Sequence, residues 1–301
     1  MIKSVTIKNY LGESFKLDLF RPEESGIRIT SIDGLGPVKA NINTMANATD
    51  DGDIFNSARL NGRNVIFDLE FMFKPTIEAV RHKTYEMFPI KKKVEMTFET
   101  DIRTSYTTGY VESNEPNIFS KDEGTSISII CPDPYLYSKD MNQTYFSGVE
   151  SEFEFPFSNE SLTENLLVFS SLWFLKEQTV LYEGDLNMGV VIHIHALGPV
   201  SGLVIHSIST GGTISIDDAK LKSISGGGIQ YGDSITISTV KGDKFINLLR
   251  DGVYYNLLNT LSKTSEWFIL DSGDNLFVYS AKTGESNLQF MIENRIAYEG
   301  V

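Results

Sequence analysis

Three histidines are the residues whose types and spacing come nearest to a metal site. His193 and His195 are two residues apart in a strand-like alternating stretch, so both side chains would lie on one face. A hairpin folded about Gly198–Gly202 would bring His206 opposite His193, and three imidazoles with an open fourth position suit zinc. A one-residue slip in register would move His206 to the other face, and no glutamate is placed as a catalytic partner. We predict no metal site, and a zinc hydrolase stays open as an alternative.

Other candidate chemistries are weaker. Asp50, Asp51 and Asp53 form an acidic loop, but the alternating oxygen ligands and closing glutamate of a calcium loop are missing, so we interpret the loop as a turn. Cys131 lies between an apolar strand end and a proline with no histidine nearby, which indicates a buried side chain and not a nucleophile. Nucleophile elbows and glycine-rich phosphate loops are absent from the sequence. We predict no enzymatic activity and no cofactor.

Charge excludes further classes. The net charge is −14: the first 134 residues hold 16 basic and 20 acidic residues, and the rest hold 10 and 20. The run Lys91–Lys93 precedes a strand without interleaved aromatic residues, so we interpret it as a solvated strand start and predict no specific nucleic-acid binding. No stretch approaches the roughly 20 apolar residues of a membrane span, which predicts no membrane association. Met1–Val5 lacks an apolar signal core, which predicts a cytosolic site of synthesis.

Alternation of apolar and polar residues predicts a mainly β chain. In the first half, strands are expected at residues 2–20 as a hairpin, 27–32, 38–44, 64–73, 94–100, 106–111 and 126–131. One helix is expected after Pro75, which suits its first position, with one apolar stripe formed by Ile77, Val80, Thr84, Met87 and Phe88 and with Pro89 ending it. Two segments, Gly34–Pro37 and Ala46–Arg63, look too long for connections within one compact domain, and we interpret them as arms that join subunits.

A proline pair divides the chain. In Cys131-Pro132-Asp133-Pro134 each proline fixes its own φ and keeps the preceding residue extended, so a strand ends there and a stiff connection follows. We predict that these four residues form an interdomain hinge between domains 1–134 and 135–301. The second part has short strands separated by glycine-rich turns, among them stretches at 153–157 and 165–169, and a short helical turn within 256–261. Many short strands at that spacing predict an antiparallel sandwich.

Several motifs, taken in order, resemble the distal tail protein (Dit) family of long-tailed bacteriophages and their prophages. They run nearly from end to end of the chain: Ile32–Ala40, Asp51-Gly52, Arg59 with Gly62-Arg63-Asn64, Ile77 to Lys93, Cys131–Tyr135, Phe155–Glu160 and Gly189–Val200. The resemblance implies a split-barrel belt domain with one helix at residues 1–134, followed by a galectin-like β-sandwich at residues 135–301.

The resemblance also implies a structural role. Members of the family form a homohexameric ring at the tail tip, with a central channel for DNA, and join the tail tube protein to tail-associated hub, fibre or receptor-binding proteins. We therefore expect a virion protein that is assembled in the host bacterial cytoplasm. By the same resemblance, Gly36, Pro37, Arg59 and Arg63 are expected near subunit contacts.

A carbohydrate-binding module for attachment to the host cell wall is the alternative. A galectin-type site combines histidine, asparagine and arginine with a stacking tryptophan. The stretch around His193 and His195 lacks the asparagine and arginine, and Trp267 has no arginine nearby in the sequence. From the sequence we therefore expect no measurable binding to cell-wall polysaccharide.

Overall fold

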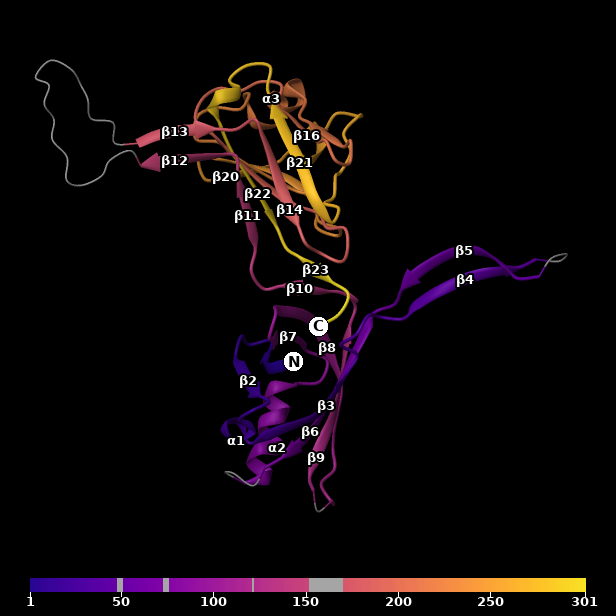
Figure 1. Cartoon of the computed structure of the whole chain (residues 1–301). Coiled ribbons are helices and arrows are strands. Elements are labelled where there is room, and N and C mark those ends of the chain that lie inside the picture. The colour runs from indigo at the N-terminus through magenta and orange to yellow at the C-terminus, as the bar shows by residue number, and fades with distance from the viewer. Residues whose placement is uncertain (48–50, 73–75, 121, 152–169) are drawn as a thin grey trace, which may run out of the picture. The chain divides into compact units, whose positions relative to one another are not determined.

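The chain is almost entirely β structure. The computed structural model describes residues 1–47, 51–72, 76–120, 122–151 and 170–301 (Figure 1). They form two compact units: the first comprises Met1–Asp140 with Ala297–Val301, and the second comprises Met141–Ile296. Within the described ranges, no helix is long and apolar enough to cross a membrane. The mainly β fold class expected from the sequence is confirmed.

The first unit holds a curved antiparallel sheet in the order β2-β1-β7-β8-β9-β6-β3, with β10 and β23 attached beside β8. Its end strands, β2 and β3, contact each other although no ladder joins them in the described chain, so the sheet curls into an open barrel. The elements of this unit are β1 (Ile2–Lys8), β2 (Ser14–Asp18), α1 (Pro22–Ser25), β3 (Ile27–Asp33), β4 (Ala40–Ala46), β5 (Asp53–Leu60), β6 (Arg63–Phe71), α2 (Ile77–Met87), β7 (Lys93–Thr100), β8 (Thr104–Pro116), β9 (Gly124–Cys131), β10 (Leu136–Ser138) and β23 (Ala297–Tyr298).

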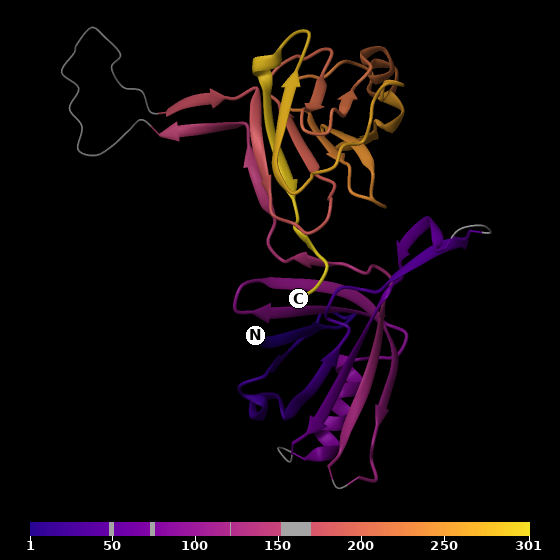
Figure 2. The same cartoon turned by 45° about the vertical axis from the view of Figure 1, so that its right-hand side comes forward.

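The predicted helix is α2, and it lies against the sheet of the first unit (Figure 2). Its start is capped by the Thr76 hydroxyl, which accepts a hydrogen bond from the Ala79 amide at 3.2 Å. Val80, Thr84 and Met87 are buried, as their spacing predicted, and Phe88 packs on Phe67 of β6 with ring centroids 5.9 Å apart. The expected first position, Pro75, lies outside the described residues. The sequence did not predict α1, a single turn without buried residues.

Strands β4 and β5 pair only with each other and form a two-stranded sheet, which we call the arm. Within Ala46–Arg63, the segment interpreted from the sequence as an arm, a polar loop was expected over Ala46–Phe55 and no strand; β5 begins at Asp53, so that loop is shorter than expected. Local sequence misled because Asp51-Gly52 is a turn signal for a loop or a hairpin tip alike, and only pairing with β4 distinguishes them. A bulge lies between Asn43 and Thr44, where the register shifts.

The second unit is a two-sheet sandwich. One sheet has the order β11-β22-β15-β18-β19-β20, and the other has the order β14-β21-β16-β17, while β12 and β13 pair separately. The elements are β11 (Asn142–Tyr145), β12 (Ser147–Ser151), β13 (Ser170–Phe174), β14 (Glu177–Tyr182), β15 (Val191–Ala196), β16 (Val204–Ser207), β17 (Thr213–Ser215), α3 (Asp218–Ser225), β18 (Ser234–Ser238), β19 (Phe245–Arg250), β20 (Val253–Asn256), η1 (Leu258–Thr260), β21 (Gly273–Ser280), η2 (Glu285–Asn287) and β22 (Leu288–Asn294).

Both sheets contribute aromatic side chains to the sandwich core. Phe290 of β22 stacks on Tyr279 of β21 with centroids 5.0 Å apart, and Phe146 meets Phe290 edge-on at 4.9 Å. The antiparallel sandwich agrees with the sequence prediction, and the expected helical turn at 256–261 is the 3-10 turn η1. Helix α3 was not predicted, because its eight residues bury only Leu221 and Ser225 and so give almost no periodic signal. The stretches predicted at 153–157 and 165–169 lie outside the described residues.

The proline-rich connection lies inside the first unit. Strand β9 ends at Cys131, as expected, and the chain then leads through Pro132–Pro134 into β10. Strand β10 pairs with β8 through Tyr137 and Tyr106, and with the C-terminal strand β23. The first compact unit extends to Asp140, and the last five residues return to it. The boundary after residue 134 and the interdomain hinge at Cys131, Pro132, Asp133 and Pro134 stay predictions.

Candidate functional sites: a buried arginine, an exposed arm and a sheet groove

Arg63 is the most heavily bonded side chain near the predicted subunit-contact residues. It starts β6, is only 2% exposed, and its guanidinium donates to four backbone carbonyl oxygens. Nη1 bonds the carbonyls of Gly34 at 2.6 Å and Gly36 at 2.8 Å, Nε bonds Pro134 at 2.8 Å, and Nη2 bonds Glu299 at 2.6 Å. One planar group therefore ties together the turn before the arm, the proline-rich connection and the C-terminal segment.

The turn that Arg63 holds depends on glycine. Gly34 has φ of +82°, a conformation that side chains disfavour, and a Cβ there would overlap the Asn64 carbonyl oxygen. On the other side of the turn the Val301 amide donates to the Leu35 carbonyl at 3.0 Å. Burial lowers the pKa of Arg63 from its usual value, but an arginine starts so far above neutral that it stays charged.

The four predicted contact residues fall into two groups. Arg63 directs its donors into its own chain, so any contribution to a subunit contact would come from the segments it positions. Gly36 and Pro37 are exposed on the turn that it holds. Arg59 is exposed on β5, opposite Asn41 of β4. Their role at an interface remains a prediction.

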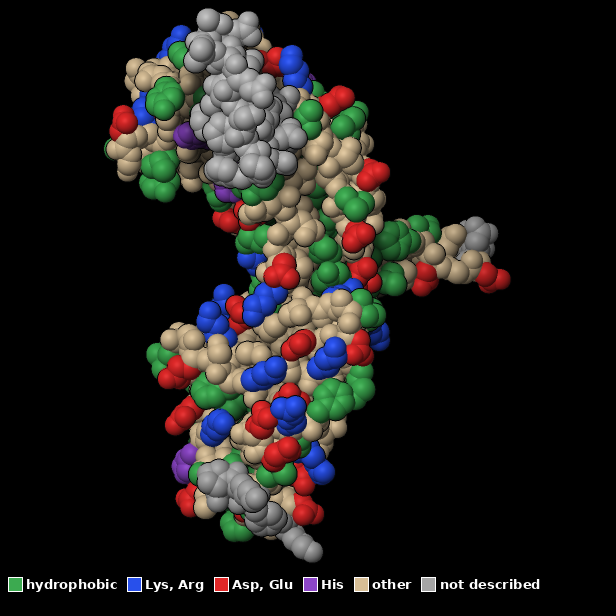
Figure 3. Space-filling model, turned by 60° about the vertical axis from the view of Figure 1, so that its left-hand side comes forward, with side chains coloured by type: hydrophobic (Ala, Val, Ile, Leu, Met, Phe, Trp, Pro, Cys, Tyr) green, Lys and Arg blue, Asp and Glu red, His purple; other side chains and the backbone are tan. Residues whose placement is uncertain are grey.

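The arm carries apolar side chains in the open. Every residue of β4 and all of β5 except Leu60 are exposed, including Ile42 at 60% and Phe55 at 63% (Figure 3). Ile42 pairs with Ala58, and Phe55 pairs with Thr44; because residues 42 and 44 share a face of β4, Ile42 and Phe55 lie on the same face. The opposite face carries the polar pairs Asn41–Arg59 and Asn43–Ser57, and beyond them the exposed apolar pair Met45–Ile54. An isolated two-stranded hairpin is at best marginally stable in water, so this apolar face calls for a partner.

Asp53 of the acidic run, and Lys92 and Lys93 of the basic run Lys91–Lys93, belong to strands or contact neighbouring side chains in the first unit. Asp53 is the first residue of β5 and accepts a hydrogen bond from the Thr44 hydroxyl at 3.0 Å, so it belongs to the arm hairpin. Asp50 lies outside the described residues. Lys93 starts β7, and the Lys92 ammonium lies 5.2 Å from the centre of the Tyr10 ring.

Cys131 is fully buried at the end of β9. Burial raises the pKa of its thiol from 9.0 to about 11, because the thiolate would lose its hydration. The thiol therefore stays protonated near neutral pH, as expected for a structural side chain.

The raised pKa of Cys131 predicts a loss of stability in alkali. Below pH 9 the thiol is protonated in both states and contributes nothing; between 9 and about 11 it ionises only in the unfolded chain. In this window its contribution to the free energy of unfolding should fall by about 1.4 kcal/mol per pH unit. The measurement is urea unfolding of the wild type and Cys131→Ala across that range. A difference between the two proteins that does not change with pH would contradict the prediction.

The three-histidine zinc alternative is wrong. His193 and His195 share the outer face of β15, but His206 lies on β16 in the other sheet, where it faces Thr213 of β17 and Val278 of β21. The residue opposite His193 is Thr236 on one side and Met291 on the other. Sequence reasoning assumed that neighbouring strands pair, whereas β15 and β16 belong to opposite sheets. In the described part of the chain, no three His, Cys, Asp or Glu side chains are grouped to hold a metal.

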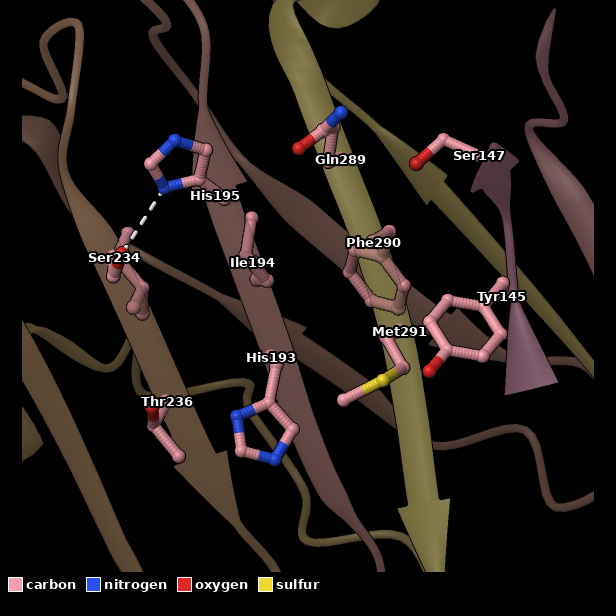
Figure 4. Close-up of a pocket in the computed structure, with 11 residues that line it drawn as sticks. Tyr145, Ser147, His193, Ile194, His195, Ser234, Thr236, Gln289, Phe290 and Met291 are labelled. Atoms are coloured by element: carbon pink, nitrogen blue, oxygen red, sulfur yellow. Dashed lines mark hydrogen bonds between the residues drawn. The ribbon is translucent and has the colours of Figure 1, made fainter. Parts of the chain in front are cut away.

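His193 and His195 instead line a groove of about 450 Å³ on the outer face of the six-stranded sheet (Figure 4). His193 Nε2 lies 3.1 Å from Glu293 Oε2, and His195 Nδ1 lies 3.0 Å from the Ser234 hydroxyl. Figure 4 shows Gln289 and Tyr145 beside them on the same face. The sequence signal for this site was the pair of histidines; its other residues come from distant strands.

Comparison with known proteins shows which solved structures have a similar fold. No protein-family model matches the sequence, and none of the curated proteins matches it. Among solved structures, the two-unit β fold matches phage tail-hub and baseplate proteins. The chain is similar to the Dit protein of phage SPP1, described as a paradigm of the hub adsorption apparatus in phages that infect Gram-positive bacteria, with a TM-score of 0.64 and 11% identity over 97% of this chain and 99% of that one.

Two baseplate structures of phage P2 also match. The calcium-activated form gives a TM-score of 0.48 with 12% identity over 98% of each chain, and the strontium form gives 0.46 with 12% identity over 97% of each. The SPP1 comparison establishes that this chain has a Dit-like fold over nearly its whole length, which confirms the resemblance inferred from the sequence motifs. The motif Phe155–Glu160 lies outside the described residues.

Proposed function

We propose that this chain is a structural protein of a phage tail tip. Six copies form a ring with a central channel for DNA, and the ring joins the tail tube protein to a tail-associated hub, fibre or receptor-binding protein. The observation that carries the proposal is the Dit-like fold, which extends over 97% of the chain and 99% of the SPP1 hub protein. It acts as part of the virion after assembly in the bacterial cytoplasm.

The arm supports assembly from several copies. Its exposed apolar face contains Ile42 and Phe55, and burial of such side chains contributes roughly 1.5–3 kcal/mol each. In the proposed ring, a neighbouring copy covers this face. Gly36, Pro37 and Arg59 lie near the contact, and Arg63 sets the direction of the arm from its root through the turn at Gly34 and Gly36.

The net charge and the settings of Cys131 and the histidines agree with a protein that lets DNA pass without reacting with it. Each copy carries a net charge of −14, so six copies would carry about −84, which disfavours adhesion of passing DNA. The buried, protonated Cys131 and the separated histidines provide no nucleophile or metal centre. The protein acts by holding neighbours in place and not by catalysis.

The mass in solution tests the ring. Light scattering across a concentration series should show a species near six times 33.7 kDa, and negative-stain images of it should show a central hole. A monomer at every concentration, or a closed dimer without a channel, would contradict a ring formed by this chain alone.

Substitutions on the two faces of the arm test its role. The double variant Ile42→Asn, Phe55→Asn should raise the concentration needed for assembly at least about tenfold, because two apolar side chains per contact are lost. The matched control Asn43→Ala, Ser57→Ala changes the opposite face and should assemble like the wild type. Equal effects of both double variants would show that the apolar face is not the contact.

A further inference from the structure

The groove on the six-stranded sheet of the second unit has the features of a built binding site. Its lining residues come from five strands: β11, β22, β15 and β18, which are neighbours in that order in one sheet, and β12, which contributes Ser147. His195 lies opposite Gln289 on one side and Ser234 on the other, and His193 lies opposite Met291 and Thr236. Paired residues of adjacent strands share a face, so these groups converge on the same hollow (Figure 4). Because they stand on strands, their positions are set before any ligand arrives.

The groove is polar without carrying charged residues on its walls. Of the residues that the structure shows lining it, none is Lys, Arg, Asp or Glu. An anionic ligand such as a phosphate would find no Lys or Arg there, and the Glu293 carboxylate beside the groove is already engaged with His193 Nε2 at 3.1 Å. The lining instead mixes hydroxyl, amide and imidazole groups, which together can donate and accept hydrogen bonds.

Several of these groups have unused hydrogen-bonding capacity. Within the described chain, the amide of Gln289 and the hydroxyl of Thr236 make no hydrogen bond to protein. His195 uses Nδ1 for the Ser234 hydroxyl, which leaves its Nε2 available. Fixed groups with open capacity, spread along a hollow of about 450 Å³, suit a ligand with many hydroxyl groups.

Tyr145 supplies an aromatic wall. Its ring is 50% exposed at the edge of the groove, and its hydroxyl donates to Gln143 Oε1 at 2.7 Å, which limits how the ring can turn. Met291 lies opposite Tyr145 across the strand pair, between the ring and His193. An exposed aromatic face beside polar groups can pack against the C–H face of a pyranose while its hydroxyls are bonded.

A peptide fits this place less well. Peptides that join a sheet pair with an open edge strand. The strand at the centre of the groove, β15, is paired on both sides, with β18 and β22, so its backbone groups are already engaged. The groove therefore offers side chains and not a backbone edge.

We propose that the groove formed by Tyr145, His193, His195, Thr236 and Gln289 binds a neutral oligosaccharide. This goes beyond the structural role proposed above and does not depend on ring formation. It differs from the expectation drawn from the sequence, which was no measurable binding to cell-wall polysaccharide. That expectation considered residues near the histidines in sequence, whereas the groove takes its partners from other strands. Trp267, the tryptophan considered there, lies beneath the Lys244 ammonium at 5.4 Å and does not line the groove.

Binding of the full-length protein to an array of neutral and anionic glycans tests the proposal. Neutral glycans should bind saturably, and the strongest of them should then be titrated in solution by calorimetry. No binding to any neutral glycan, or stronger binding to anionic glycans or to a peptide control, would overturn the proposal. Light scattering of the same sample reports assembly separately, so a failure of one proposal does not hide the other.

Variants locate the site. Gln289→Ala and Tyr145→Ala should each weaken binding of that glycan about tenfold or more, the second through loss of the aromatic wall. His206→Ala, on the opposite sheet, and Tyr231→Ala, an exposed tyrosine outside the groove, are matched controls that should bind like the wild type. If the controls lose as much affinity as the groove variants, or if the groove variants bind unchanged while keeping the wild-type circular dichroism spectrum, the proposed site is wrong.

Discussion

Replacement of Arg63 with alanine should lower the free energy of unfolding of the first unit by about 3–5 kcal/mol. The guanidinium is 2% exposed and bonds four carbonyl oxygens, those of Gly34, Gly36, Pro134 and Glu299. Its loss removes a donor from each of these acceptors and opens a cavity where the side chain was. Urea unfolding followed by circular dichroism measures the change.

Two further substitutions separate geometry from charge. Arg63→Lys keeps the positive charge but has a single nitrogen that cannot reach carbonyls on several sides, so we expect it to recover only a small part of the loss. Arg59→Ala removes an exposed arginine from the arm and should change the free energy of unfolding by no more than about 0.5 kcal/mol. If Arg63→Lys were as stable as the wild type, charge alone would explain the role of Arg63.

The second large effect is expected in the second unit, where Arg250 and Asp233 form a buried pair. Arg250 donates to both carboxylate oxygens, with Nε to Oδ1 at 2.8 Å and Nη2 to Oδ2 at 2.6 Å. Its remaining donors bond the carbonyls of Ser225 and Gly228, so the pair holds the glycine-rich turn after α3. The hydrogen bonds to Asp233 raise the pKa of Arg250.

Arg250→Ala should cost about 3–5 kcal/mol, because Asp233 is 1% exposed and would keep a buried charge without its partner. Lys176→Ala is the control in the same unit: its ion pair with Glu285 lies at 2.6 Å, but the lysine is largely exposed, so about 0–1 kcal/mol is expected. Thermal unfolding of both variants, monitored by the fluorescence of Trp173 and Trp267 in the second unit, makes the comparison. Similar losses in the two variants would show that burial of Asp233 does not set the cost.

The two arginines play similar parts in separate units. Each is largely buried, and each bonds carbonyls of a turn that contains a glycine with positive φ, Gly34 in one case and Gly226 in the other. From sequence alone an arginine is expected to be a surface charge. The role of Arg63 and Arg250 in holding turns therefore became clear only from the structure. What made Arg63 noticeable in the sequence was its place in a family motif, and that motif pointed to a subunit contact.

Local elements were predictable where the side-chain pattern or the prolines of one continuous stretch are enough to define the element. The spacing of Val80, Thr84 and Met87 predicted α2, and the alternation along β6 predicted which side chains face the core. The prolines after Cys131 marked the end of β9. Elements that depend on a partner were missed or misjudged: β5 looked like a loop without β4, and α3 was too short for a pattern.

The sequence by itself determined the mainly β class, the sandwich in the second part, the helix α2 and the Dit resemblance, because side-chain periodicity and proline geometry act over neighbouring residues. Only the tertiary structure decided which strands pair. That choice separated His206 from His193, brought Gln289 and Ser234 beside His195, and joined Arg63 to the Glu299 carbonyl 236 residues away. The physical reason is that such contacts depend on the burial and register of whole sheets, and a residue's sequence neighbours carry no record of which strand will lie beside it.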